Sequence, residues 1–473
     1  METLGTEARP LRVAIVGAGP AGFYAADALL KKPDLVVAID IYNRFPAPFG
    51  LVRDGVAPDH QSIKAVARVF DKLLADERVR YFGNVTFGVD LHHHDLRRRY
   101  DQLVWAIGAQ ADRRMSIPGE DLLGSLPAIA FVGWYNGHPD YRELPVDLSC
   151  ERAVVVGNGN VAMDIARVLA LPPDELASTD IADHALAKLS DSKVQEVIVL
   201  GRRGPAQASF TTPELKELGK LPGVDVVLDA GDLELEPASE AALEDDRTAK
   251  ANLRLLYEYA ARGDRTAPRR IHLRFLASPV EVVGDGEGRV TELMVERNEL
   301  VVDANGGIRS KGTGQVEVIE TGLVLRAIGY RTVPIEGVPF DHATSTLSNI
   351  AGQVVHPNTG EIVPAEYVVG WAKRGPTGLI GNNRTDSRST VETMLADLPW
   401  LGPWLEQSED AERDPAEVER FLRERGIDYV TYEDWRVLDA HEVAMGAEQG
   451  RPRVKVTTVP EMLAIIRQGR QGR

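Results

Sequence analysis

Two short glycine motifs are the clearest places in this chain where residue type and spacing could do chemistry. In the GxGxxG pattern the first glycine permits a tight turn, and the second lets the backbone approach a pyrophosphate. The third small residue lets a helix pack closely on a strand, and the start of that helix offers free N–H groups to the phosphates. The pattern therefore predicts two dinucleotide sites. The first is Gly17, Gly19 and Gly22, and the second is Gly157, Gly159 and Ala162.

The residues at the adenosine ribose position indicate which nucleotide each unit prefers. In the second unit VLGRRGP places Arg202 and Arg203 there, with no Asp or Glu. A guanidinium suits a 2′-phosphate, so we expect NADP rather than NAD. In the first unit the position is Asn43, where a carboxylate normally holds the ribose. We expect a weaker ribose contact there.

Apolar runs supply the elements that would position these motifs. Residues 11–16 and 153–156 read as the strands before the two glycine turns, and residues 23–30 and 163–171 as the helices after them. Residues 35–42 and 194–200 read as the next strands. We expect an α/β fold with two Rossmann-like dinucleotide-binding domains.

Two similar phrases, LVWAIGA at 103–109 and LVLRAIGY at 323–330, bracket the second unit. Each is an apolar strand that ends at a glycine, as expected where a chain crosses between packed domains. We therefore expect a discontinuous first domain, residues 1–109 and 329–473, with a second domain, residues 110–328, inserted into it.

Composition restricts the function classes. The net charge is −17, from 54 Lys+Arg and 71 Asp+Glu, which disfavours nucleic acid as a partner. The single cysteine, Cys150, excludes an internal disulfide, a CxxC redox pair and a cysteine-ligated iron–sulfur cluster. The sequence shows no signal-peptide pattern and no membrane-length apolar run, so we expect a cytoplasmic protein that is not integral to a membrane. If both sites hold redox nucleotides, electrons must leave to an external acceptor, to oxygen or to a bound substrate.

Four longer phrases carry a family resemblance. GLVRDGVAPDH at 50–60, FVGWYNGHP at 131–139, GRRGPAQASFTTPEL at 201–215 and GWAKRGPTGLIGNNRTDS at 370–387 resemble adrenodoxin reductase and the bacterial NADPH-ferredoxin reductases of its type. The resemblance implies a glutathione-reductase-like fold, with FAD bound non-covalently by the first domain and NADP(H) by the inserted one. It also implies hydride transfer from NADPH to FAD, then two one-electron transfers to a ferredoxin, an acidic iron–sulfur protein. A cytochrome P450 or similar acceptor would follow, and we expect a monomer.

The resemblance also implies site residues beyond the glycine motifs. For FAD they are Ala21, Asn43, Leu51, Val85, Trp371, Gly378, Leu379 and Ile380. For NADP they are Arg113, Asn158, Gly159, Asn160, Val161, Arg202, Arg203, Glu214 and Gly378.

His60, Glu214 and Asp164 are the candidate catalytic, proton-handling groups near the flavin. Because hydride transfer itself needs no acid or base, the alternative is that they only position the nicotinamide or link the domains. The run His92 to His94 has no cysteine or acid at ligand spacing, so we interpret it as a polar loop rather than a metal site.

A ferredoxin would need a local basic face on this acidic chain. One candidate is the arginine-rich stretch from Arg254 to Arg274, and a solvated helix face explains it equally well. Its basic residues are Arg254, Arg262, Arg265, Arg269, Arg270 and Arg274, opposed by Glu258 and Asp264.

Two other function classes remain open at this point. A flavin monooxygenase also has two dinucleotide units, but its FxGxxxHxxxW fingerprint fails here, because the histidine falls one place late at His138 and Arg142 replaces the tryptophan. The other alternative is a redox-sensing flavoprotein that acts through a protein partner.

Overall fold

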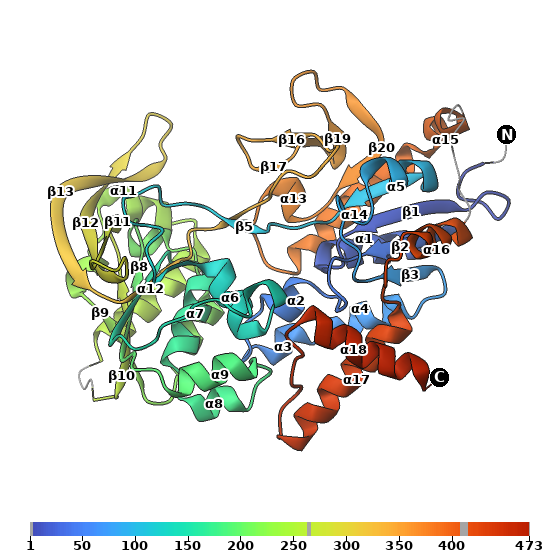
Figure 1. Ribbon diagram of the computed structural model, residues 1–473. Helices are drawn as coiled ribbons and strands as arrows, with labels where there is room; N and C mark the ends of the chain where they lie inside the picture. Colours follow the sequence, from blue (N-terminus) through green and yellow to red (C-terminus); the bar gives the residue numbers. More distant parts are fainter. Residues whose placement is uncertain (1–2, 263–265, 407–414, 473) are drawn as a thin grey trace.

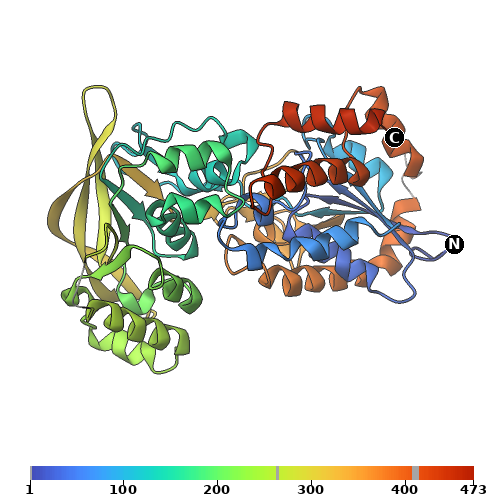
Figure 2. The same cartoon turned by 90° about the horizontal axis from the view of Figure 1, so that it is seen from below.

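The computed structural model describes residues 3–262, 266–406 and 415–472. Figures 1 and 2 show two lobes side by side, joined by a narrower middle region. The first described strand and the last helix, α18 (Val459–Gln471), both belong to the same lobe. The chain therefore leaves that lobe and returns to it.

The first lobe is built on a seven-stranded sheet. Its central strands are parallel, since β1 pairs with both β2 and β4, and β4 pairs with β20. In spatial order the strands are β18 (Asn349–Ile350), β19 (Gln353–Val355), β20 (Ile362–Val368), β4 (Gln102–Trp105), β1 (Leu11–Val16), β2 (Val37–Tyr42) and β3 (Val79–Phe82). Strand β1 is buried except at Arg12, which explains why its other residues are all apolar.

Helices cover both faces of this sheet. Helix α1 follows the first glycine turn and packs against α14, a helix from far along the chain. Aromatic rings fill the space beside them, with Phe23 stacked on Phe70 at 4.8 Å. The helices of this lobe include α1 (Pro20–Leu30), α2 (Leu51–Asp54), α3 (Gln61–Lys64), α4 (Ala67–Leu74), α5 (His93–Arg99), α13 (Trp371–Arg374), α14 (Asn382–Ala396), α15 (Leu398–Glu406), α16 (Pro415–Glu424) and α17 (Tyr432–Glu448).

The second lobe repeats the plan with a six-stranded parallel sheet. Its order is β6 (Ser125–Pro127), β14 (Leu323–Arg326), β7 (Arg152–Val156), β8 (Glu196–Leu200), β10 (Arg269–Arg274) and β9 (Val224–Leu228). An antiparallel sheet of β11 (Ala277–Gly284), β12 (Val290–Val302) and β13 (Ile308–Glu320) extends at the far side of the lobe (Figure 1). Its helices include α6 (Ala128–Asn136), α7 (Asn160–Ala170), α8 (Pro173–Ala177), α9 (Asp183–Ser190), α10 (Thr212–Leu218), α11 (Pro237–Leu243) and α12 (Arg247–Ala260).

The expected α/β fold with two Rossmann-like units is confirmed, and the predicted strands and helices fall within a few residues of the observed ones. The crossings between the lobes run side by side: β5 (Ala111–Asp112) pairs with β15 (Tyr330–Arg331). The domain boundaries near 109 and 329 stay a proposal, which this pairing supports.

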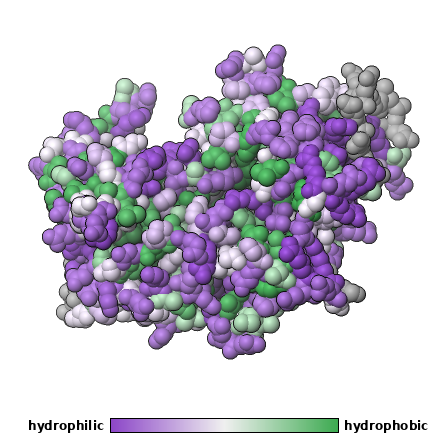
Figure 3. All heavy atoms as spheres, viewed as in Figure 1, coloured by the Kyte–Doolittle hydropathy of each residue, from purple (hydrophilic) through white to green (hydrophobic). Residues whose placement is uncertain are grey.

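The face in Figure 3 is mostly hydrophilic, with hydrophobic residues in small groups. In the part of the chain that the structure describes, no helix combines the length and apolar character needed to cross a membrane.

Candidate functional site

The first glycine motif forms a turn between β1 and α1. Gly17 has φ +117°, and a Cβ there would overlap the carbonyl oxygen of Ala106, the residue after β4. At Gly22 a Cβ would overlap the Gly17 carbonyl. At Gly19, by contrast, a Cβ would meet no protein atom within 4 Å. Protein packing requires glycine at the first and third positions, whereas the middle one faces open space that a ligand could enter.

The second motif repeats this geometry between β7 and α7. Gly157 has φ +124°, and a Cβ there would overlap the carbonyl oxygen of Ala327, the residue after β14. Gly159 again has nothing within 4 Å of the Cβ position. Ala106 and Ala327 are equivalent residues of the two repeated phrases, so equivalent strands, β4 in the first unit and β14 in the second, lie behind the two turns. The other predicted contacts of this turn, Asn158, Asn160 and Val161, lie half-buried around it.

Three distant segments that carry residues predicted to contact FAD lie near the first turn or its helix. Gly50, just before Leu51, approaches the Gly19 Cα closely enough that a Cβ would lie 3.0 Å away. Gly370, just before Trp371, packs on the Cβ of Ala21. Figure 1 shows these segments, α2 and α13, near the start of α1. Gly378, Leu379 and Ile380 precede α14, which packs against α1.

Asn43 follows β2, and its side chain has a structural role that the sequence does not reveal. Its amide nitrogen donates to the carbonyl oxygens of Phe45 and Ala47, both at 2.9 Å. The amide of Val85 donates to the Asn43 carbonyl at 3.0 Å. A carboxylate in place of the Asn43 side chain could not donate the two hydrogen bonds to Phe45 and Ala47. The side-chain oxygen of Asn43 can still accept a hydrogen bond from a ribose hydroxyl, without the charge assistance of a carboxylate.

Arg202 and Arg203 follow β8 as predicted, next to the second turn. Within the described ranges, neither guanidinium has a hydrogen bond or ion pair. Arg203 borders a cavity of about 520 Å³, which Gln207, Ser239, Asp246 and the tip of the β12–β13 hairpin also line. Burial, followed by the charge of Arg202, lowers the pKa of Arg203. Adjacent guanidiniums beside a cavity of ligand size favour an anionic ligand.

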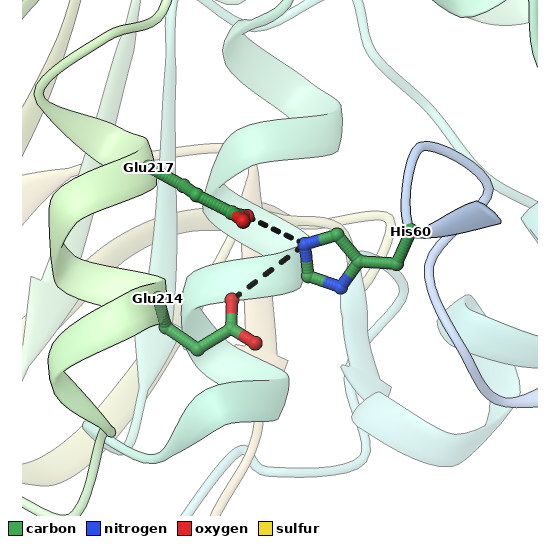
Figure 4. A group of neighbouring side chains, drawn as sticks. All are labelled: His60, Glu214 and Glu217. Carbon is green, nitrogen blue, oxygen red and sulfur yellow. Dashed lines mark hydrogen bonds and ion pairs between the residues drawn. The ribbon is translucent and has the colours of Figure 1, made fainter. Parts of the chain in front are cut away.

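A charged cluster joins the lobes where α3 meets α7 and α10. His60 Nε2 lies 2.7 Å from Glu217 Oε2 and 3.8 Å from Glu214 Oε2. His60 Nδ1 lies 3.7 Å from Asp164 Oδ1. Figure 4 shows both glutamates projecting from α10 toward the same imidazole nitrogen. The three predicted catalytic residues are thus brought together, although their chemical role stays a prediction.

Arg167, which we did not predict, is the cation of this cluster and is only 1% exposed. Its guanidinium donates to Asp164 at 2.6 Å and to Glu214 at 3.1 Å, and it forms an ion pair with Asp59. Burial works against its charge, but the carboxylates of Asp164 and Asp59 raise the pKa of Arg167. The arginine therefore stays charged and links the lobes.

The pKa of Asp164 is shifted within this cluster. Burial raises the pKa of Asp164 to about 6, against the lowering effect of Arg167. The spacing of Asp164 and Arg167 on α7, three residues apart, is the one sequence signal for this pair. Asp59 and Glu217 carry no such signal, because their partners lie on other elements.

The crossing between the lobes holds two buried polar atoms without partners among the described residues, Trp371 Nε1 and Asp112 Oδ1. The Trp371 ring lies 5.7 Å from that of Tyr330. Arg113, a predicted NADP contact, is exposed beside them and its amide donates to the Gly329 carbonyl. Buried polar atoms without partners are uncommon in folded proteins, so these could face a bound group.

The arginine-rich stretch is divided between two elements, and its role as a docking surface stays a prediction. Arg254 lies on α12, whereas Arg269, Arg270 and Arg274 belong to β10, and Asp264 and Arg265 lie outside the described residues. Arg270 forms an ion pair with Glu196 near the amino ends of β10 and β8. The second glycine turn follows the carboxyl end of β7, which runs parallel to β8. Arg269 donates to the carbonyl of Leu171. Arg270 nevertheless keeps a side chain that is 54% exposed, and Arg274 ends β10 at the carboxyl edge of the sheet.

Two smaller interpretations also change. The histidine run is not a loop: His92 caps α5, and His93 and His94 form its first turn. The failed monooxygenase fingerprint lies on α6, where a Cβ at Gly133 would overlap the ring of Tyr141. Gly133 is thus required by helix packing.

Comparison with known proteins agrees with this geometry. Residues 11–255 match the pyridine nucleotide-disulphide oxidoreductase family. The NADPH-ferredoxin reductase FprA of Mycobacterium tuberculosis is 46% identical over 461 residues, covering 97% of this chain and 99% of that protein. The chain belongs to this reductase family. A structure of M. tuberculosis FprA in complex with NADPH superposes with a TM-score of 0.91, over 97% of this chain and 100% of that one.

The wider reductase family includes the mitochondrial NADPH:adrenodoxin oxidoreductase of Arabidopsis thaliana, which is 40% identical over 96% of this chain and 95% of that protein. The resemblance to adrenodoxin reductase is therefore confirmed. The broader family is that of pyridine nucleotide-disulphide oxidoreductases. This chain has a single cysteine, so it cannot use an internal redox disulfide.

Proposed function

We infer that the protein is an FAD-dependent NADPH-ferredoxin reductase. The observation that carries this is the pair of matching glycine turns, each with a middle glycine that faces open space, in a chain 46% identical to a protein named NADPH-ferredoxin reductase. A further relative, 43% identical over 96% of this chain, is named a probable ferredoxin/ferredoxin–NADP reductase. These names favour ferredoxin reduction over the monooxygenase and sensor alternatives.

The residues present fit both nucleotides. The first turn would hold the FAD pyrophosphate, with Asn43 at the ribose and Trp371 Nε1 as a donor without another partner. The second turn would hold the NADP pyrophosphate, with Arg202 and Arg203 at the 2′-phosphate. A flavin held at the first turn would supply the redox chemistry that links hydride transfer from NADPH to one-electron transfer to ferredoxin.

The chain's own residues bind and orient the nucleotides at the junction of the lobes. His60 comes from the first lobe and Glu214 and Asp164 from the second, so the two lobes together build the proposed catalytic cluster. Arg167 holds the acids of this cluster in place. His60 and Asp164 are positioned to hold or pass a proton, and the same contacts would orient the nicotinamide.

The test is reduction of the bound yellow flavin by NADPH and by NADH, followed by cytochrome c reduction with and without added ferredoxin. We expect bleaching that strongly prefers NADPH, and cytochrome c reduction that depends on ferredoxin. Substrate-dependent NADPH oxidation with a long-lived oxygenated flavin would instead identify a monooxygenase. Ferredoxin-independent partner binding that changes with flavin redox state would identify a sensor.

Three finer points belong to the same proposal. The downstream acceptor is a cytochrome P450 or a similar protein that receives electrons from ferredoxin. The reductase acts as a monomer, which sedimentation at working concentration checks. It acts in the cytoplasm, which fractionation of source cells checks.

A further inference from the structure

A short segment near the C-terminus binds to the second lobe, although the helices on either side of it belong to the first. This connecting segment, residues 451–457, joins α17 to α18 (Figure 1). Its Arg451 side chain, only 3% exposed, donates to the carbonyl oxygens of Thr179, at 2.9 Å, and Ile181. Arg451 also donates to Asp183 at 2.5 Å. The connecting segment is therefore bound to the second-lobe loop 178–182, which joins α8 to α9.

Lys455, in the same segment, bonds to both lobes with one side chain that is 1% exposed. Its ammonium donates to the carbonyl oxygen of Arg53, in α2 of the first lobe, at 3.1 Å. It also donates to the carbonyl oxygen of Asn136, in α6 of the second lobe, at 3.0 Å. A carboxylate oxygen of Asp180, in the loop 178–182, lies 3.2 Å from the same ammonium. Lys455 thus links α2 to the second lobe.

Helix α3 of the first lobe holds Asp180 from another direction. Lys64 donates to both carboxylate oxygens of Asp180, at 2.7 and 2.8 Å, and Gln61 donates to one of them at 2.9 Å. Burial works against the charge of Asp180, but the ammoniums of Lys455 and Lys64 lower the pKa of Asp180. The acid therefore stays charged, and two first-lobe segments bind it at once.

Only the step between the two nucleotides depends on how the lobes are oriented. The first glycine turn lies within the first lobe, whereas the second turn, with Arg202 and Arg203, lies within the second. Hydride transfer needs the reacting atoms within about 3–3.5 Å, and a displacement of about 1 Å can slow a reaction about 100-fold. His60 immediately precedes α3, so the bonds from α3 to Asp180 also fix His60 relative to the second-lobe acids.

We propose that Lys64, Arg451 and Lys455 are positioning residues for hydride transfer, which hold the loop 178–182 and keep the two lobes in one orientation. The inference rests on the proposed reductase function, because it requires a flavin in the first lobe to meet a nicotinamide from the second. The three residues act through the orientation of the lobes and take no chemical part in the reaction.

Burial distinguishes these contacts from other links between the lobes. The ion pair of Arg44 with Asp140 also crosses the junction, but its side chains are 54% and 36% exposed. Water and salt weaken exposed ion pairs, so such a pair restrains an orientation little. The loss of one partner from a buried set leaves a charge or a carbonyl without compensation, so the buried set resists rotation of the lobes.

The test is stopped-flow reduction of the FAD-loaded protein at saturating NADPH, with Lys455→Met as the main variant. Methionine keeps much of the side-chain length, and Lys64 and Asp180 remain as a balanced ion pair. We expect flavin bleaching to slow by about tenfold or more, while the FAD content and the Kd for NADP+ stay within about twofold of the wild type. Unchanged FAD content and NADP+ affinity would show that each lobe is folded.

The matched control is Arg453→Met, in the same connecting segment. The Arg453 guanidinium donates to Asp439 and Glu442, both on α17 of the first lobe, so this variant should bleach at the wild-type rate. Arg451→Gln should slow bleaching as Lys455→Met does, because it loses bonds to the second lobe.

Small-angle X-ray scattering measures the orientation of the lobes directly. We expect the wild type to give one scattering curve with and without NADP+, and a Lys455→Met, Arg451→Gln double variant to give a larger radius of gyration. A wild type that NADPH does not bleach would refute the reductase function and this inference with it. If the wild type bleaches, an unaffected rate in Lys455→Met, equal slowing in Arg453→Met, a parallel loss of FAD or NADP+ affinity, or equal radii would each refute the positioning role alone.

Discussion

Arg53 and Glu442 form a two-bonded ion pair inside the first lobe, although 389 positions separate them in the chain. The two bonds measure 2.8 and 2.5 Å, and Glu442 is completely buried. Glu442 also accepts a hydrogen bond from the amide of Val456 at 2.9 Å. This pair fastens helix α17 to α2, the segment beside the first glycine turn.

Removal of one partner should be costly. We expect Glu442→Ala to lower the free energy of unfolding by about 3–5 kcal/mol, because a buried guanidinium loses its counter-charge. Urea titration of the FAD-free protein measures this. Glu392→Ala is the control, since Glu392 pairs with Arg388 on an exposed helix face and should cost about 0.5 kcal/mol or less. Equal losses in the two variants would show that the buried pair adds no stability.

The glycine turns should separate folding from nucleotide binding. Gly159→Ala should leave stability nearly unchanged, because a Cβ there meets no protein atom, and raise the KM for NADPH at least tenfold. Gly19→Ala should likewise fold but retain FAD poorly. Gly157→Ala should destabilise the fold, because of its φ of +124° and the overlap with Ala327. Thermal unfolding with nucleotide titration distinguishes these effects, and normal NADPH binding by Gly159→Ala would refute the assignment of that turn.

Nucleotide selectivity should depend on the paired arginines. Arg203→Ala should weaken NADPH binding by about 1.5–3 kcal/mol, the range for hydrogen bonds to charged groups, and change NADH binding little. Arg202→Ala should act in the same direction. Steady-state KM values for both nucleotides check this. A parallel loss for NADPH and NADH would mean that Arg203 does not contact the 2′-phosphate.

Stability should depend on pH through Asp112 at the crossing. Burial raises the pKa of Asp112 from 3.8 to about 7, so the folded protein keeps this carboxyl protonated over a range where the unfolded chain loses the proton. The fold is therefore favoured most at low pH, and this contribution falls as the pH rises from about 4 to about 7 and is constant above.

Asp112→Asn should remove that dependence, because an amide keeps the acceptor for the Ile129 amide without a charge. The variant should equal the wild type near pH 4 and exceed it by up to about 4 kcal/mol above pH 7. Denaturant unfolding across this range measures the difference. A constant difference between variant and wild type would show that Asp112 does not titrate in this window.

The features that were predictable from sequence are those set by neighbouring residues. A strand, a glycine turn and a helix follow one another within about 20 residues, so apolar periodicity and glycine spacing predict them. Arg202 and Arg203 were found in the same way, since the ribose position lies at a known distance beyond the turn. The single cysteine excluded a disulfide mechanism without any structure.

Only the tertiary structure brought together residues that belong to different lobes. Arg167 shows no special pattern beyond Asp164, yet it contacts Asp59, 108 positions earlier, and Glu214, 47 positions later. The arginine stretch shows the same dependence, because residues that are neighbours in sequence are divided between α12 and β10. Long-range packing decides which charges meet, because burial makes each charge depend on partners that local periodicity does not specify.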